Sequence, residues 1–163
     1  MRRLLSLFVM LYLLYPTLGF SLPNDTTQTM HITANSTTFD LKKGFDTYEG
    51  DVKINQGTTR LTADRLTTQK NNHKMEEAIA YGDPAHYWTL PKTGDKEFHA
   101  QASIIKFYPL KSLVMLEGNV VITQGENSFH GPMIIYNIKN QIVSAPANPK
   151  GRATIVIEPK QLQ

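Results

Sequence analysis

The stretch Tyr48-Glu-Gly-Asp-Val-Lys-Ile-Asn-Gln-Gly57 decides the fold, because it returns 68 residues later as Leu116-Glu-Gly-Asn-Val-Val-Ile-Thr-Gln-Gly125. Extended to residues 31–57 and 99–125, the comparison needs no gap and gives ten identities in 27 positions. A weaker copy, residues 81–88, lies about midway. Repetition of this kind is typical of stacked units that bury their apolar faces only against neighbours. The sequence therefore predicts an internally repeated protein, with a strand pair of about 34 residues used about four times.

The repeated segments alternate at period two, which is the period of a β-strand with one buried face. The apolar or small residues of this alternation are Tyr48, Gly50, Val52 and Ile54 in the first copy and Val114, Leu116, Gly118, Val120 and Ile122 in the second. Residues 74–80 have some helical composition but no amphipathic helical period, so a strand is predicted there as well. We expect an all-β protein with no helix in residues 22–163.

The N-terminus has the organisation of a secretory signal peptide. Two arginines precede an apolar run over residues 4–15, and small residues follow it. The run is too short for a membrane span, which needs about 20 residues. We expect cleavage of a signal peptide over residues 1–21 and export. The remaining chain is divided into a flexible lead-in over 22–29, one domain over 30–158 and a C-terminal tail over 159–163.

Charge and cysteine content exclude several function classes. The 17 basic and 14 acidic residues give a net charge of +3, but loss of Arg2 and Arg3 with the leader leaves 15 against 14, a net charge of +1. The chain has no clustered basic face, so no nucleic-acid partner is expected. With no cysteine, the chain can have no disulfide, thiol nucleophile or lipoprotein anchor.

No catalytic or cofactor motif is present, so we expect neither an enzyme, a cofactor nor a metal site. The five histidines are scattered, and His31 and His99 occupy equivalent positions of the repeat, which favours a structural or surface role. The Gly-Asp and Gly-Asn pairs at residues 50–51, 82–83 and 118–119 are typical of turns or bulges. Replacement of Asp by Asn in the last pair argues against acid–base chemistry there.

The row of apolar residues on one strand face has two interpretations. The first is a filled sandwich core. The second is a groove for lipid, favoured because large residues such as Phe39 and Phe107 alternate with small ones such as Ala34 and Ala102, and because a repeat array has open edges. The residues alone leave both open.

Six motifs in order resemble the LptA family of lipopolysaccharide-transport bridge proteins, which contain an OstA-like repeat domain. They are Met30-His-Ile-Thr-Ala34, residues 48–57, Leu61-Thr-Ala-Asp64, Gly82-Asp-Pro-Ala85, Leu116-Glu-Gly-Asn119 and the ending Pro159-Lys-Gln-Leu-Gln163. The resemblance covers nearly all of the chain after the leader. It implies an open-ended, twisted β-jellyroll of about 16 antiparallel strands with an apolar interior.

The resemblance also implies a periplasmic function. Lipopolysaccharide would slide through a continuous groove formed by protomers joined end to end, which dock on inner-membrane and outer-membrane components of the same transport system. Strands near residues 30–40 and 152–158 would carry this assembly. The residues that match the family's inward pattern are Met30, Ile32, Phe39, Tyr87 and Phe107, and alternation adds Val52, Ile54, Leu116, Val120 and Ile122 as further lipid-binding residues.

Two rival functions come from other classes. One is a structural periplasmic β-repeat filament with a filled core and no lipid cargo. The other is a glycan-binding or glycan-cleaving β-protein, for which Trp88 with Tyr87 and Asp83 is the candidate cluster.

Overall fold

The computed structural model describes residues 25–72, 74–90, 95–140, 142–147, 149 and 151–157. The expected signal peptide and the expected C-terminal tail lie outside these residues. Within the described part of the chain, no helix is long and apolar enough to cross a membrane. The helical elements there are two single turns of 3-10 helix, η2 (Asp25–Thr27) and η3 (Pro109–Lys111), so the described fold is all-β as predicted.

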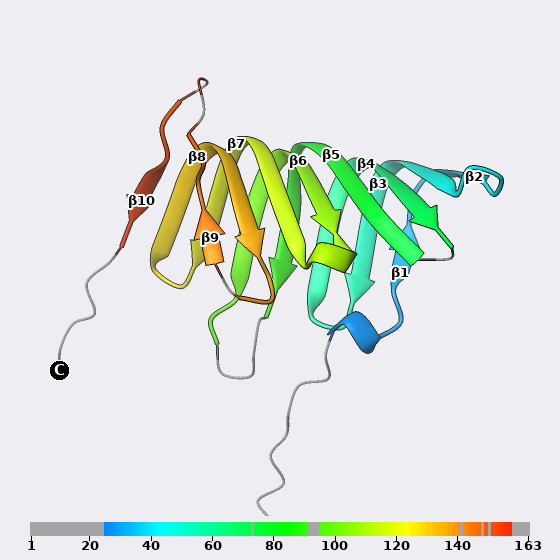
Figure 1. The fold of residues 1–163 in the computed structure, drawn as a ribbon, viewed down its shortest axis with the longest axis horizontal. Coiled ribbons are helices and arrows are strands. Elements are labelled where there is room, and N and C mark those ends of the chain that lie inside the picture. The colour runs from blue at the N-terminus through cyan, green and yellow to red at the C-terminus, as the bar shows by residue number, and fades with distance from the viewer. Residues whose placement is uncertain are drawn as a thin grey trace, which may run out of the picture.

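In the described part of the chain, ten strands form one antiparallel sheet, whose arrangement is drawn in Figure 1. Six of them are long: β3 (Phe45–Gln56), β4 (Thr59–Asn71), β5 (Lys74–Thr89), β6 (Phe98–Tyr108), β7 (Leu113–Gln124) and β8 (Asn127–Asn137). They lie side by side in chain order, joined as hairpins. Four short strands complete the two edges: β1 (His31–Thr33) and β2 (Ser36–Asp40) on β3, and β9 (Ile142–Ser144) and β10 (Thr154–Val156) on β8.

The long strands bend at aligned bulges, which fold the sheet into two layers. The register shifts between Glu49 and Val52 on β3, and each following pair of long strands has a matching shift near its middle. The short strands show the result, because β1 pairs with the C-terminal half of β3 and β2 with its N-terminal half. In the same way, β10 pairs with the N-terminal half of β8 and β9 pairs with its C-terminal half. We call the half-sheet that ends in β1 and β10 the first layer and the half-sheet that ends in β2 and β9 the second layer.

Positive backbone φ angles build two of these bulges. Gly50 and Asp51 have φ of 77° and 46°, and Gly118 and Asn119 have 79° and 50°. A left-handed conformation suits glycine, and asparagine or aspartate tolerate it, which explains the residue types. The predicted turn or bulge role of these pairs is confirmed. Gly82 and Asp83 also lie at a bulge, inside β5, with a cis peptide bond between Asp83 and Pro84.

The described residues form ten strands where the family resemblance implied about 16. The chain keeps its ladder hydrogen bonds on both sides of each bulge, so a long strand passes through both layers as one element. Residues 74–80, predicted as strand, are the first half of β5.

The lead-in expected to be flexible is bonded to the sheet in its described part. The Asp25 carboxylate accepts hydrogen bonds from the Thr58 amide at 2.8 Å and the Thr58 hydroxyl at 2.6 Å. The Thr59 hydroxyl donates a third bond at 2.8 Å. Burial raises the pKa of Asp25, but the bonds from Thr58 and Thr59 together outweigh it and hold this pKa below its ordinary value. Asp25 is therefore anchored beside the β3–β4 turn.

Candidate functional site

The inner face between the two layers is the apolar surface that the alternation predicts. Val52, Leu116, Val120 and Ile122 are each at most 1% exposed and belong to one hydrophobic cluster. The cluster continues through both layers with Leu66, Ala80, Ala102, Ile105 and Ile134. Its small residues lie mostly on β5 and β6, where Ala80, Ala85, Ala100 and Ala102 are buried.

The ten predicted lipid-binding residues fall into three groups. Val52, Leu116, Val120 and Ile122 are fully buried, so in this state they are packed. Ile32, Ile54, Tyr87 and Phe107 are partly buried and pack against the same cluster. Met30 and Phe39 lie outside the cluster, and Phe39 is 54% exposed. The structure thus brings eight of the ten together.

Aromatic rings connect the two layers. Phe98, at the start of β6 in the first layer, stacks on Tyr136 of β8 in the second layer, with ring centroids 4.7 Å apart. Tyr87 meets Phe98 edge to face at 6.3 Å. Burial raises the pKa of Tyr87, and hydrogen bonds with the hydroxyls of Thr59 and Thr89 oppose that shift. The layers therefore touch where Phe98 meets Tyr136.

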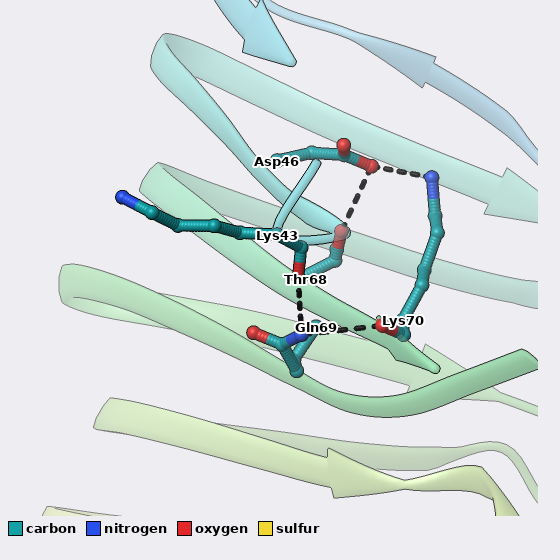
Figure 2. A network of polar contacts seen from close by, with 5 residues as sticks. All are labelled: Lys43, Asp46, Thr68, Gln69 and Lys70. Carbon is teal, nitrogen blue, oxygen red and sulfur yellow. Dashed lines mark hydrogen bonds and ion pairs between the residues drawn. The ribbon is translucent and has the colours of Figure 1, made fainter. Parts of the chain in front are cut away.

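An ion pair between a buried carboxylate and a partly exposed lysine interrupts the apolar inner face of the second layer (Figure 2). The Asp46 side chain is 4% exposed and bonds the Lys70 ammonium group, while the Thr68 hydroxyl donates to the same carboxylate oxygen at 3.1 Å. Asp46 and Thr68 are Cα partners on β3 and β4, and Lys70 lies two residues further along β4 on the same face. The neighbouring Lys43 side chain points away from this group (Figure 2). Sequence reasoning missed the pair because only the strand register brings it together.

Both edges of the sheet expose large apolar side chains. At the β2 edge, Phe39 is 54% and Leu41 is 89% exposed. At the β10 edge, Ile155 is 55% and Ile157 is 70% exposed. The segments predicted to carry assembly, residues 30–40 and 152–158, contain the edge strands β1, β2 and β10.

The outer face of the first layer has two hollows of about 740 and 620 Å³. Trp88, Glu97 and His99 line both of them. The predicted glycan cluster of Trp88, Tyr87 and Asp83 is wrong, because Tyr87 and Trp88 are consecutive strand residues and point to opposite faces, and Asp83 lies at the bulge. Among the described residues, no group of three or more potential metal ligands occurs.

An antiparallel sheet folded along a line of bulges, apolar inside and unpaired at both edges, defines the class of open-ended β-jellyrolls. A family model described as "LptA/(LptD N-terminal domain) LPS transport protein" matches residues 31–142. The chain belongs to this family, as the six motifs indicated.

Individual relatives agree with the family assignment. The chain is 31% identical to the lipopolysaccharide export system protein LptH of Pseudomonas aeruginosa over 152 residues, which cover 88% of this chain and 87% of the relative. It is 31% identical to the lipopolysaccharide export system protein LptA of Escherichia coli K12, covering 89% and 79%. The crystal structure of Pseudomonas LptH, titled the LptA-homologous periplasmic component of a conserved lipopolysaccharide transport device, matches with a TM-score of 0.78 at 30% identity. That match covers 84% of this chain and 100% of the LptH chain.

Proposed function

We propose that this protein carries lipopolysaccharide across the periplasm by sheltering its acyl chains against the inner face of the folded sheet. The observation that carries the proposal is the continuous apolar cluster between two edges that have no partner strand in the described fold. The relatives, named as lipopolysaccharide export system proteins, support the same role. The predicted leader over residues 1–21 would deliver the chain to that compartment.

The energetics explain why such a carrier is needed. Each acyl CH₂ group exposed to water costs about 0.8 kcal/mol. A single chain of about fourteen carbons therefore costs on the order of 10 kcal/mol, and lipopolysaccharide has several chains. A largely apolar inner face removes most of this barrier, while the saccharide remains in contact with water.

The inner-face residues differ in how readily an acyl chain could reach them, because some are partly exposed and others are fully buried. Ile32, Ile54, Tyr87 and Phe107 are partly exposed, so they would meet an acyl chain first. The fully buried residues, such as Leu116 and Ile122, would meet it only after the two layers separate. The stacked rings of Phe98 and Tyr136 lie between the layers and would part in that movement.

Protomers would join end to end through the edge strands. β2 at one edge and β10 at the other present exposed apolar side chains beside backbone groups that can pair with another strand. Joining β10 of one copy to β1 of the next, and β9 to β2, would keep each layer continuous and align the inner faces of successive copies. The same edges would dock on the inner-membrane and outer-membrane components of the system.

Full burial of Val52, Leu116, Val120 and Ile122 favours a second candidate, a structural filament protein with a filled core. Mass spectrometry of lipid that co-purifies with the protein separates the two candidates. Lipopolysaccharide in the wild-type preparation supports transport, and its absence from protein purified from an envelope that contains it would favour the filament.

A charge on the inner face tests where the lipid binds. Phe107→Asp should reduce captured lipopolysaccharide at least about tenfold, because a carboxylate beside acyl chains is poorly solvated. Ile79→Asp is the matched control, since Ile79 lies on the outer face of β5, where it pairs with Lys106 of β6. Phe107→Ala should fold and capture less lipid than the wild type. Equal capture by the wild type and both Phe107 variants would contradict the proposed site.

A further inference from the structure

Trp88 is the centre of a mixed aromatic and polar surface on the outer face of the first layer. Strand pairing places it between Arg60 of β4 and His99 of β6. His86, two residues earlier on β5, lies on the same face. None of these side chains contributes to the apolar inner cluster.

Neighbouring rings hold the indole in a fixed orientation. His86 stacks on Trp88 with centroids 5.3 Å apart and an interplanar angle of 16°. His99 meets it edge on at 6.4 Å and 86°. The His99 Nε2 atom lies 2.9 Å from the Glu97 carboxylate, so the second ring is itself held in place. A preorganised aromatic surface loses little side-chain entropy when a ligand binds.

The two hollows meet at this cluster. The hollow of about 740 Å³ continues over Gln101 and Thr123, and the hollow of about 620 Å³ continues over Arg60 and Thr62. Both volumes fall within the range of roughly 300–1,000 Å³ typical of small-molecule sites. Their walls carry amide, hydroxyl, guanidinium and carboxylate groups around one large aromatic ring, with charges of both signs.

We infer that this surface binds carbohydrate, namely the saccharide part of the glycolipid whose acyl chains the inner face would shelter. A sugar ring has an apolar C–H face that packs on an aromatic ring and a periphery of hydroxyls that need both donors and acceptors. An apolar partner would leave the polar walls unpaired. The walls carry Lys53, Arg60 and Lys96 as well as Glu97 and Glu126, so they suit a ligand with many donors and acceptors better than a ligand of a single charge.

The position of the hollows suits an amphiphilic ligand that has acyl chains at one end and a saccharide at the other. The β3–β4 turn at Gly57 and Thr58 lines one hollow, and the β7–β8 turn at Gly125 and Glu126 lines the other. These turns lie at the end of the first layer opposite the bulges. A glycolipid with its tails between the layers would leave the interior at that rim, where its saccharide reaches Trp88. The inference rests on the proposed function for the source of the sugar.

The test uses the fluorescence of Trp88, which is the single tryptophan of the chain. The full chain after the leader is titrated with lipid-free oligosaccharide released from lipopolysaccharide by mild acid, and separately with soluble peptidoglycan fragments. We expect a saturable change in Trp88 emission with the first probe. Isothermal calorimetry should give at least about tenfold weaker binding for Trp88→Ala and for Arg60→Ala.

Arg65→Ala is the matched control, because Arg65 lies on β4 five residues after Arg60 but on the outer face of the second layer. It should bind the oligosaccharide as the wild type does. No saturable response to the oligosaccharide, a response to peptidoglycan fragments alone, or equal weakening by Arg65→Ala would overturn the inference. Lipid capture distinguishes failure of this site from failure of the proposed function. Trp88→Ala should still capture lipopolysaccharide through its acyl chains. Failure of the wild type to capture lipid would contradict the proposed function alone.

Discussion

Asp46 shows at the scale of one residue how the fold tolerates a charge on its apolar inner face. The carboxylate is nearly inaccessible to water, yet Lys70 and the Thr68 hydroxyl bond it from the next strand (Figure 2). A buried charge is tolerated when it is paired and hydrogen-bonded, and removal of one partner leaves the other uncompensated. The group therefore ties the β3–β4 hairpin together at the end next to β2.

Loss of the Lys70 ammonium group should destabilise the protein. Lys70→Met leaves Asp46 buried without its cation, and we expect a loss of about 2–3 kcal/mol in the free energy of unfolding, measured by urea denaturation at pH 7. Asp46→Asn should cost less, because the amide oxygen still accepts from Thr68. Lys43→Met is the control, since the Lys43 ammonium group forms a solvent-exposed ion pair with Asp40 at 3.5 Å, and its loss should change stability by less than about 1 kcal/mol. Equal losses in Lys70→Met and Lys43→Met would show that the buried pair has no special role.

At the scale of the strand, the bulges decide the architecture. They let one strand contribute to both layers, so that hairpins of simple up-and-down connectivity enclose an interior. The bulge in β7 requires glycine at position 118, because the φ of Gly118 is 79° and an added Cβ would lie 2.9 Å from the Ser103 Oγ atom.

Substitution of this glycine should be costly. Gly118→Ala combines a left-handed backbone with a close contact, and we expect a loss of about 1–2 kcal/mol by thermal or urea unfolding. Gly131→Ala on β8 is the matched control, because its φ lies outside the left-handed region and the nearest atom to an added Cβ is 3.4 Å away. If both alanine variants unfold like the wild type, the bulge does not depend on glycine.

The strand scale also shows what sequence could predict. Alternation placed Val120 and Ile122 on the inner face correctly, because period-two patterning reports which face is buried. It could not decide between a turn and a bulge at Gly118-Asn119 and Gly82-Asp83, because hairpin turns and bulges require the same residue types.

Contacts between strands were beyond prediction from sequence alone. Asp46 and Lys70 are 24 residues apart, and their pairing depends on the register of β3 with β4. Arg60, Trp88 and His99 come together only through the registers of three strands. The sequence singled out Trp88 but assigned it neighbours along the chain, whereas its partners lie across the sheet.

For the whole molecule, the two edges determine how copies can meet. Ile155 is exposed on β10, and at the other edge Leu41 follows β2. We expect the wild-type protein to form assemblies that lengthen with concentration in multi-angle light scattering.

A charge at the β10 edge should shift that distribution towards the monomer. Ile155→Asp places a carboxylate where a second copy would pack, and a tenfold loss of affinity corresponds to about 1.4 kcal/mol. Asn72→Asp is the control, because residue 72 lies in the β4–β5 turn, several strands from β10, and aspartate tolerates its φ of 47°. If Ile155→Asp assembles like the wild type, β10 is not part of the interface between copies.

The central claim is that acyl chains lie between the layers, and site-specific photo-crosslinking in cells tests it most directly. A photoreactive side chain at Tyr87 or Phe107, on the partly buried inner face, should form adducts with lipopolysaccharide, and the same group at Arg65, on the outer face of the second layer and away from both hollows, should not. Adducts at Ile122 would show in addition that the layers separate during transport, because this residue is fully buried in the closed state. Adducts at Arg65 equal to those at Tyr87 and Phe107, or none at the inner positions, would contradict the account.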